Sequence, residues 1–255
     1  MTDSVGQLRK QLPARLASLL ELIPIEGSVA DIGTDHGLLP AALIMRGQNE
    51  KVIATDVRKQ PLEAARRTLA EWKLEGKVDL RLGFGLRVLM PGEADYVVVA
   101  GISGRQTAEL LLDSQSEPVI RSLRAIICQP AQQTALLRRN LRLAGWALIH
   151  ETLVSERGKF YVNLMVRPAA RLSKEAGEES KANFLSEALL DEIGPCLWHT
   201  RPPGYRPYLL KIAERYEKIA RQARSGKDLS ASSRKRLAEL RQMSLELQRC
   251  LRELD

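Results

Sequence analysis

The chain has 255 residues, of which 44% are hydrophobic, so it can build one substantial core and a smaller appendage. No apolar run approaches the ~20 residues of a membrane-spanning helix, and the N-terminus lacks the charged and then apolar order of a secretory signal. The three cysteines and three histidines are too scattered for a zinc site. These features predict a cytoplasmic protein with reduced thiols and no bound metal.

The net charge of +8 is unevenly distributed. Residues 1–200 carry 25 Lys and Arg against 24 Asp and Glu, a net of +1, whereas residues 201–255 carry 14 against 7, a net of +7. A basic segment joined to a near-neutral domain indicates phosphate binding. Charge alone is equally compatible with an Arg-rich helix surface that is only solvated and binds no phosphate.

Short β-branched runs alternate with helical stretches from residue 28 onward, which is typical of a parallel sheet with crossover helices. Apolar spacing predicts an amphipathic helix over Leu8–Leu22 before them. The predicted strands are Ser28–Ile32, Lys51–Thr55, Val78–Leu82, Tyr96–Ala100 and Ala125–Gln129. The predicted helices lie near residues 36–47, 58–73, 104–113 and 131–144. Trp146–Val154 and Phe160–Val166 then flank a turn at Gly158, which predicts an antiparallel hairpin.

A polar linker over residues 168–181 is predicted to separate a first domain, 1–167, from a basic helical domain, 182–255. Apolar side chains repeat at spacings of three and four over Leu209–Ala223 and again over Leu237–Leu254. The segment RSGKD lies between these two stripes, so we expect the helices to fold back as an antiparallel, coiled-coil-like pair.

The segment VADIGTDHG, residues 29–37, places acids and glycines where a strand meets a helix. Its G-x-x-x-G spacing differs from the G-x-G-x-x-G of dinucleotide binders, whose additional glycine admits a pyrophosphate. S-adenosylmethionine has no pyrophosphate. Its carboxylate suits backbone N–H groups at a helix start, and its cationic amino group suits an acid such as Asp31. An ordinary tight turn is the structural alternative, and the flanking acids and strand context favour binding.

Asp56 ends the second predicted strand. An acid at this place can accept hydrogen bonds from both ribose hydroxyls of a nucleoside cofactor. It can also cap the helix that follows, and the two roles are compatible.

Five segments follow one another along the chain: ADIGTDHGLLP, GEADYVVVAGISG, IICQP, GWALIHETLVSERGKFY and IGPCLW, the last before the paired helices. Together they resemble the bacterial tRNA (adenine-N1)-methyltransferase family that modifies the D-loop adenosine at tRNA position 22. The match runs from about residue 8 to the C-terminus. The resemblance implies S-adenosyl-L-methionine as cofactor and tRNA as partner. The short apolar stripes of the tail suit an intramolecular helix pair, so we expect a monomer. Alternating units closed by an antiparallel hairpin likewise predict an α/β, class I Rossmann-like methyltransferase sheet.

The resemblance also implies roles for residues of the cofactor pocket. Asp31 and Gly33 would line the methionine end of the cofactor, and Asp56 would face its ribose. The rest of the expected pocket is His36, Gly83, Phe84 and Gly101. Phe84 stands where relatives typically have an Asp that contacts the adenine amino group, so an aromatic ring replaces an acceptor.

Asp35 is the predicted catalytic residue, with helix capping as its structural alternative. Adenine N1 carries a lone pair and needs no prior deprotonation, so the enzyme must align the reacting atoms and stabilise the positive charge that appears on the base. The Asp35 carboxylate would accept from the exocyclic amine and favour the cationic product. The resemblance places the target base between Gln129 and Pro130 on one side and Lys159 and Tyr161 on the other.

Four basic residues of the tail are predicted to contact tRNA because they lie off its apolar stripes: Arg215, Lys218, Arg234 and Arg241. Two other functions stay open from the sequence. One is a non-catalytic RNA-binding protein on a methyltransferase scaffold. The other is a small-molecule methyltransferase whose basic tail serves dimerisation or solubility.

Overall fold

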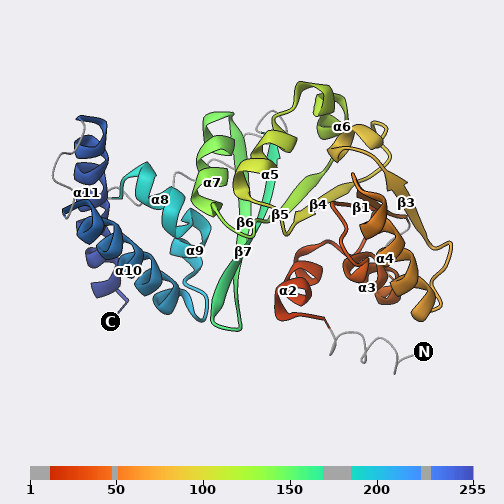
Figure 1. Cartoon of the computed structure of the whole chain (residues 1–255), viewed down its shortest axis with the longest axis horizontal. Coiled ribbons are helices and arrows are strands. Elements are labelled where there is room, and N and C mark those ends of the chain that lie inside the picture. Colours follow the sequence, from red (N-terminus) through yellow and green to blue (C-terminus); the bar gives the residue numbers. More distant parts are fainter. Residues whose placement is uncertain (1–11, 48–50, 169–184, 225–230, 255) are drawn as a thin grey trace. The chain divides into compact units, whose positions relative to one another are not determined.

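The computed structural model describes residues 12–47, 51–168, 185–224 and 231–254 (Figure 1). The chain divides into two compact units, Met1–Lys174 and Glu175–Asp255. Apart from Pro168, the predicted linker over 168–181 lies outside the described residues, so its boundaries stay a prediction.

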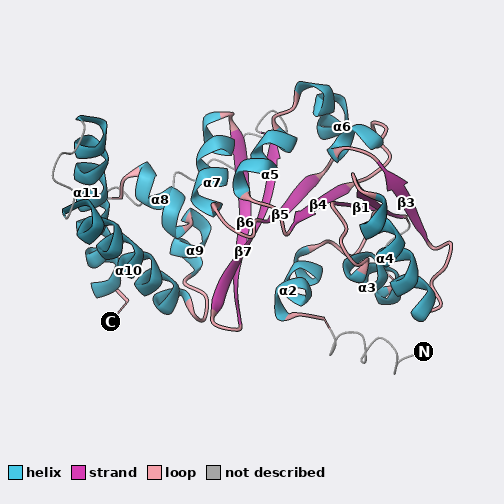
Figure 2. Cartoon of the chain, in the orientation of Figure 1, coloured by secondary structure: helices cyan, strands magenta, loops and turns pink. Residues whose placement is uncertain are grey.

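A seven-stranded sheet forms the centre of the first unit, with the strand order β3-β2-β1-β4-β5-β7-β6 (Figure 2). Five strands are parallel: β1 (Val29–Ile32), β2 (Val52–Asp56), β3 (Val78–Leu82), β4 (Tyr96–Ala100) and β5 (Ala125–Gln129). The strands β6 (Trp146–Glu156) and β7 (Lys159–Pro168) form an antiparallel hairpin, and β7 pairs antiparallel with β5. This arrangement confirms the predicted class I Rossmann-like fold.

The helices of the first unit follow from this strand order. They are α2 (Ala14–Leu22), α3 (Leu38–Arg46), α4 (Lys59–Glu71), α5 (Gly104–Leu111), α6 (Glu117–Ser122) and α7 (Thr134–Leu143). Two short 3-10 helices are η1 (Gly85–Val88) and η2 (Ser114–Ser116). Because crossover connections are right-handed, helices that precede β2 and β3 lie on one face and helices around β5 lie on the other. Both faces of the parallel strands are thereby covered.

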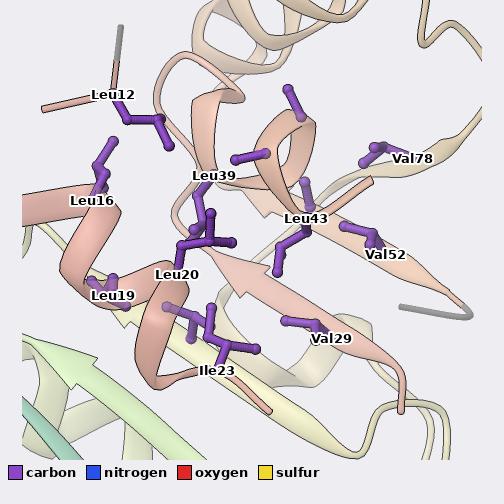
Figure 3. Close-up of a cluster of buried hydrophobic side chains, with 14 of the residues drawn as sticks. Leu12, Leu16, Leu19, Leu20, Ile23, Val29, Leu39, Leu43, Val52 and Val78 are labelled. Atoms are coloured by element: carbon purple, nitrogen blue, oxygen red, sulfur yellow. The ribbon is translucent and has the colours of Figure 1, made fainter. Parts of the chain in front are cut away.

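The core on the first of these faces joins α2 and α3 to the strands. Leucines of α2 and α3 gather with Val29, Val52 and Val78, one from each of the first three strands (Figure 3). The five side chains of β2 are all buried, as expected for a strand inside a sheet that helices cover on both faces.

The leading helix is shorter than predicted. In the part that the structure describes, it begins at Ala14 because Pro13 is extended, with ψ 141°, and Leu12 lies in a bend before it. A proline disfavours helical geometry in the residue that precedes it. Residues 8–11 of the predicted helix lie outside the described part.

The predicted hairpin is confirmed, and its strands are longer than the sequence indicated. Glu156 pairs with Lys159 across a two-residue turn. Arg157 and Gly158 form this turn with φ of 48° and 76°. Positive φ at both positions matches the right-handed twist of the flanking strands.

The second unit consists of helices in the part that is described. These are α8 (Glu187–Ile193), α9 (Pro195–Thr200), α10 (Tyr205–Arg224) and α11 (Ala231–Arg252). Helices α10 and α11 pack against each other and run in opposite directions (Figure 1). The side chains of Leu209, Tyr216 and Leu247 are buried, as the apolar stripes predicted. Residues 225–228 of the predicted RSGKD turn lie outside the described residues.

Candidate active site

A cleft of about 1030 Å³ lies in the first unit where the parallel strands end. Strand order reverses between β1 and β4, and ligands of open α/β sheets bind at such a switch point, beyond the carboxyl ends of the strands. The cleft brings together ten of the predicted site residues: Asp31, Gly33, Asp35, His36, Asp56, Gly83, Phe84, Gly101, Gln129 and Tyr161.

The other predicted residues lie elsewhere. Pro130 is buried and Lys159 is exposed, and neither lines this cleft. Arg215, Lys218 and Arg241 belong to the second unit. The side chain of Arg234 is outside the part that the structure describes.

Asp31 lies one residue before the end of β1 and is only 5% exposed. Burial raises the pKa of its carboxyl to about 6, against a hydrogen bond from Thr34 that lowers it, and the negative charge of Asp56 raises it further. Among the described residues, no cationic side chain pairs with Asp31. A buried carboxylate without a counter-ion favours a ligand that carries a positive charge.

Gly33 turns the chain from β1 toward α3. Its φ is +84°, and its N–H donates to the Thr55 carbonyl oxygen at 2.8 Å. A Cβ built on Gly33 would meet no atom within 4 Å, so backbone geometry rather than space requires glycine here. Gly37 differs, because a Cβ there would lie 2.9 Å from Cβ of Ala65.

Asp56 ends β2 and is 6% exposed. Its Oδ1 accepts the backbone N–H of Arg58 at 2.8 Å and lies 3.5 Å from Nε of the same residue. Arg58 is itself the N-cap of α4, which has no side-chain cap. Asp56 therefore shapes the turn before α4 and does not cap that helix. Its position at the cleft suits the two hydroxyl groups of a ribose.

Two apolar side chains are exposed beside Asp56. Val57 and Phe84 are each 55% exposed, and both line the cleft. The Arg87 guanidinium carbon lies 5.3 Å from the centre of the Phe84 ring, and Asp113 holds that guanidinium by hydrogen bonds of 2.9 and 3.2 Å. Exposed apolar surface inside a cleft favours a flat apolar ligand group.

The loop that carries Phe84 is fixed by its two glycines. Gly83 donates its N–H to the Asp56 carbonyl oxygen at 2.9 Å. A Cβ on Gly83 would lie 2.1 Å from the Val88 side chain, and one on Gly85 would lie 2.5 Å from that of Leu110. The β-branched side chain of Val88 leaves no room for a Cβ at Gly83, and the positive φ of 54° favours glycine at Gly85.

Asp35 and His36 stand at the mouth of the cleft. Their side chains are 75% and 65% exposed, with Oδ2 of Asp35 3.4 Å from Nε2 of His36. The N-cap of α3 is Gly37, and no side chain caps this helix. The capping role considered for Asp35 is therefore absent, and its carboxylate is accessible from the cleft.

Gln129 is 1% exposed at the end of β5 and belongs to a buried polar network. Its Nε2 donates to the Arg15 carbonyl oxygen at 2.8 Å and to Oδ1 of Asn163 at 2.6 Å. Asn163 in turn donates to the hydroxyls of Ser18 and Thr152, at 3.0 and 2.8 Å. The side-chain amide of Gln129 thus links β5, β7 and α2. Its nitrogen is used within the protein and has a structural role.

Residues 12–164 match the family model described as a methyltransferase domain. The chain belongs to this methyltransferase family.

Individual relatives of the methyltransferase domain extend the match. The chain is 29% identical over 187 residues to the tRNA (adenine(22)-N(1))-methyltransferase of Bacillus subtilis, which covers 73% of this chain and 75% of that protein. The crystal structure of the B. subtilis m1A22 tRNA methyltransferase TrmK is similar with a TM-score of 0.77 at 26% identity, covering 94% and 98% of the two chains. A putative tRNA (m1A22) methyltransferase of Streptococcus pneumoniae gives 0.76 at 25% identity, covering 92% and 99%.

Several residues of the methyltransferase cleft escaped the sequence analysis. Arg15, Thr34, Gln106 and Glu109 all line it. Thr34 sits inside the quoted motif, so its hydroxyl could have been included as a donor to Asp31. Arg15 carried no signal, because it appeared only as a polar residue of an amphipathic helix.

Two classes of feature are absent from the described residues of the methyltransferase. No group of three or more His, Cys, Asp or Glu side chains is arranged to hold a metal ion. No described helix is long and apolar enough to cross a membrane.

Proposed function

We propose that this protein transfers a methyl group from S-adenosyl-L-methionine to N1 of an adenosine in the D-loop of tRNA, at position 22, in the cytoplasm. The observation that carries the proposal is the buried carboxylate of Asp31, which no described cationic side chain pairs with, at the switch point of a methyltransferase sheet. The B. subtilis relative named above supports the substrate, since its name specifies that nucleotide.

The surfaces of the cleft fit S-adenosylmethionine part by part. Asp31 offers a buried carboxylate to a cationic amino group, and Asp56 offers an acceptor to ribose hydroxyls. Val57 and Phe84 offer exposed apolar surface to a purine. When bound, S-adenosylmethionine supplies an electrophilic methyl group.

The remaining chemistry falls to residues that orient the target base and stabilise its charge. Adenine N1 needs no base to deprotonate it, so positioning supplies most of the acceleration. Asp35 is accessible at the mouth of the cleft, where its carboxylate can accept a hydrogen bond from the exocyclic amine. That contact strengthens as the purine becomes cationic, so it favours the product side of the reaction.

The basic second unit is proposed to bind the phosphates of tRNA. Lys218 and Arg241 are exposed on α10 and α11. Arg215 is ion-paired with Glu192, and its guanidinium carbon lies 5.6 Å from the centre of the Tyr216 ring. We therefore assign Lys218 and Arg241 the larger share of the phosphate contacts, with the protein acting as a monomer.

Methylation of a defined transcript tests the proposal. The full-length protein is incubated with S-adenosylmethionine and unmodified tRNA, and the nucleosides are analysed by mass spectrometry. We expect 1-methyladenosine with wild-type tRNA, none when adenosine 22 is replaced by guanosine, and strongly reduced product with Asp31→Asn.

Two outcomes would contradict the proposed function and favour one of the two alternative functions. Cofactor binding without methylation of any tRNA would favour a small-molecule methyltransferase. Binding of tRNA without measurable affinity for S-adenosylmethionine would favour a non-catalytic RNA-binding protein.

A further inference from the structure

Arg15 places a guanidinium group at the cleft, where no side chain of the described residues pairs with it. It is the second residue of α2, is half-buried and lines the cleft. Its hydrogen bonds to Glu156, Ser18 and Gln129 all involve its backbone, and none of the described acids pairs with its side chain. The other arginine of the cleft, Arg58, lies against the Asp56 carboxylate at 3.5 Å.

The backbone of Arg15 is held from two directions. Its N–H donates to Oε2 of Glu156 in the hairpin at 2.9 Å. Its carbonyl oxygen accepts from Nε2 of Gln129 at 2.8 Å and from the Ser18 hydroxyl at 2.9 Å. Long-range hydrogen bonds of a buried network fix the start of α2 on the end of β5. The network therefore sets where the guanidinium is presented, while leaving its N–H groups for a ligand.

The strand order places Arg15 away from the cofactor end of the cleft. Asp56 and Phe84 follow β2 and β3 at one edge of the parallel strands. Arg15 hydrogen-bonds to the end of β5, and Ala131 and Tyr161 line the cleft from the loop after β5 and from β7. The strands β1 and β4 lie between the two groups. If the nucleoside of the cofactor lies beside Asp56, the target adenosine must enter the cleft from the side on which Arg15 lies.

Resting on the proposed tRNA function, we propose that Arg15 binds the phosphodiester next to the target adenosine. Guanidinium stays charged at all working pH values and contacts phosphate through two parallel hydrogen bonds. The acidic side chains of the cleft, among them Asp35 and Glu109, repel phosphate. A base taken out of its stack into a pocket brings its own phosphate to the rim, where Arg15 supplies the matching charge.

Substitution of Arg15 in the full-length protein tests this role. Arg15→Gln should lower kcat/KM for unmodified tRNA by about tenfold or more, since a charge-assisted contact is lost. The slope of log K against log salt for tRNA binding should become shallower by about 0.7–0.9, the contribution of one phosphate. The affinity for S-adenosylhomocysteine should stay within about twofold of wild type. Arg15→Lys, which keeps the charge without the planar fork, should recover part of the loss.

Lys77→Gln is the matched control. It removes one exposed positive charge from the same unit, and Lys77 directly precedes β3, at the amino end of the strand, whereas the cleft lies at the carboxyl ends. We expect wild-type kinetics and an unchanged salt slope from this variant.

Three results would overturn the assignment. If Arg15→Gln keeps the wild-type kcat/KM and the wild-type salt slope, Arg15 does not contact a phosphate of the tRNA. An equal loss in Lys77→Gln shows that only the overall charge matters. A parallel loss of affinity for S-adenosylhomocysteine shows that Arg15 supports the fold of the pocket. If the wild-type protein binds S-adenosylhomocysteine but methylates no tRNA, the proposed reaction fails separately, and the salt slopes of tRNA binding still decide the role of Arg15.

Discussion

Acidification through pH 6 should weaken cofactor binding because it neutralises Asp31. Burial raises the pKa of this carboxyl to about 6 in the free protein, whereas a bound cationic amino group stabilises the charged form. The pKa of Asp31 must therefore fall on binding, and the competent, charged form is lost as pH falls through 6. About 1% of the protein is protonated at Asp31 at pH 8 and about 90% at pH 5, so the apparent affinity should drop about tenfold between them.

Titration calorimetry with S-adenosylhomocysteine, which has the same amino group, measures this change. The Asp31→Asn variant should bind about tenfold or more weakly at pH 8 and should lose the pH dependence. His36 lies at the mouth of the same cleft, so His36→Asn serves as the control and should keep the dependence. A wild-type affinity that is flat from pH 8 to 5, or the same dependence in Asp31→Asn, would refute the reasoning.

Three further substitutions address other parts of the site. Asp35→Ala should reduce single-turnover methyl transfer to tRNA about tenfold or more with cofactor affinity within twofold, and near-normal transfer would remove the carboxylate from the reaction. Phe84→Ala should weaken binding of S-adenosylhomocysteine about fivefold or more through lost stacking, and calorimetry showing no change would exclude the ring as a purine platform. Combined charge reversal of Lys218 and Arg241 to Glu should lower tRNA affinity and flatten its salt dependence, while tRNA binding equal to wild type at one salt concentration would rule out α10 and α11 as the binding surface.

The strands, and the fact that Asp31 and Asp56 line one cleft, could be predicted because their determinants are local. A run such as YVVVA is buried along its length, and it forms β4 over the predicted residues. Asp31 and Asp56 stand out because an acid near the end of an apolar strand is unusual by itself. Parallel strands bring such ends together, so the two carboxylates share one cleft.

Gln129 and Tyr161 line the cleft as predicted, but the packing around Arg15 could not be predicted because its contacts span the chain. Gln129 is 114 residues from Arg15, and Asn163 is 145 residues from Ser18, so no spacing rule connects them. The role of Arg215 was obscured in a similar way, since its ion pair with Glu192 joins α10 to a helix that the sequence analysis did not resolve. Pattern reasoning detects neighbours along one helix or strand, whereas these contacts depend on tertiary packing.

The network around Arg15 also sets an order of assembly during protein synthesis. The carboxylates and glycines of the cofactor end are all translated by residue 101, but Arg15 waits for Glu156, 141 residues later. At ribosomal speeds of about 5–20 residues per second, the 55 residues from Gly101 to Glu156 take roughly 3–11 s. A nascent chain should therefore complete its nucleoside-binding half well before its rim arginine is anchored. If Arg15 binds RNA as proposed, the protein should engage RNA only after the hairpin has left the ribosome.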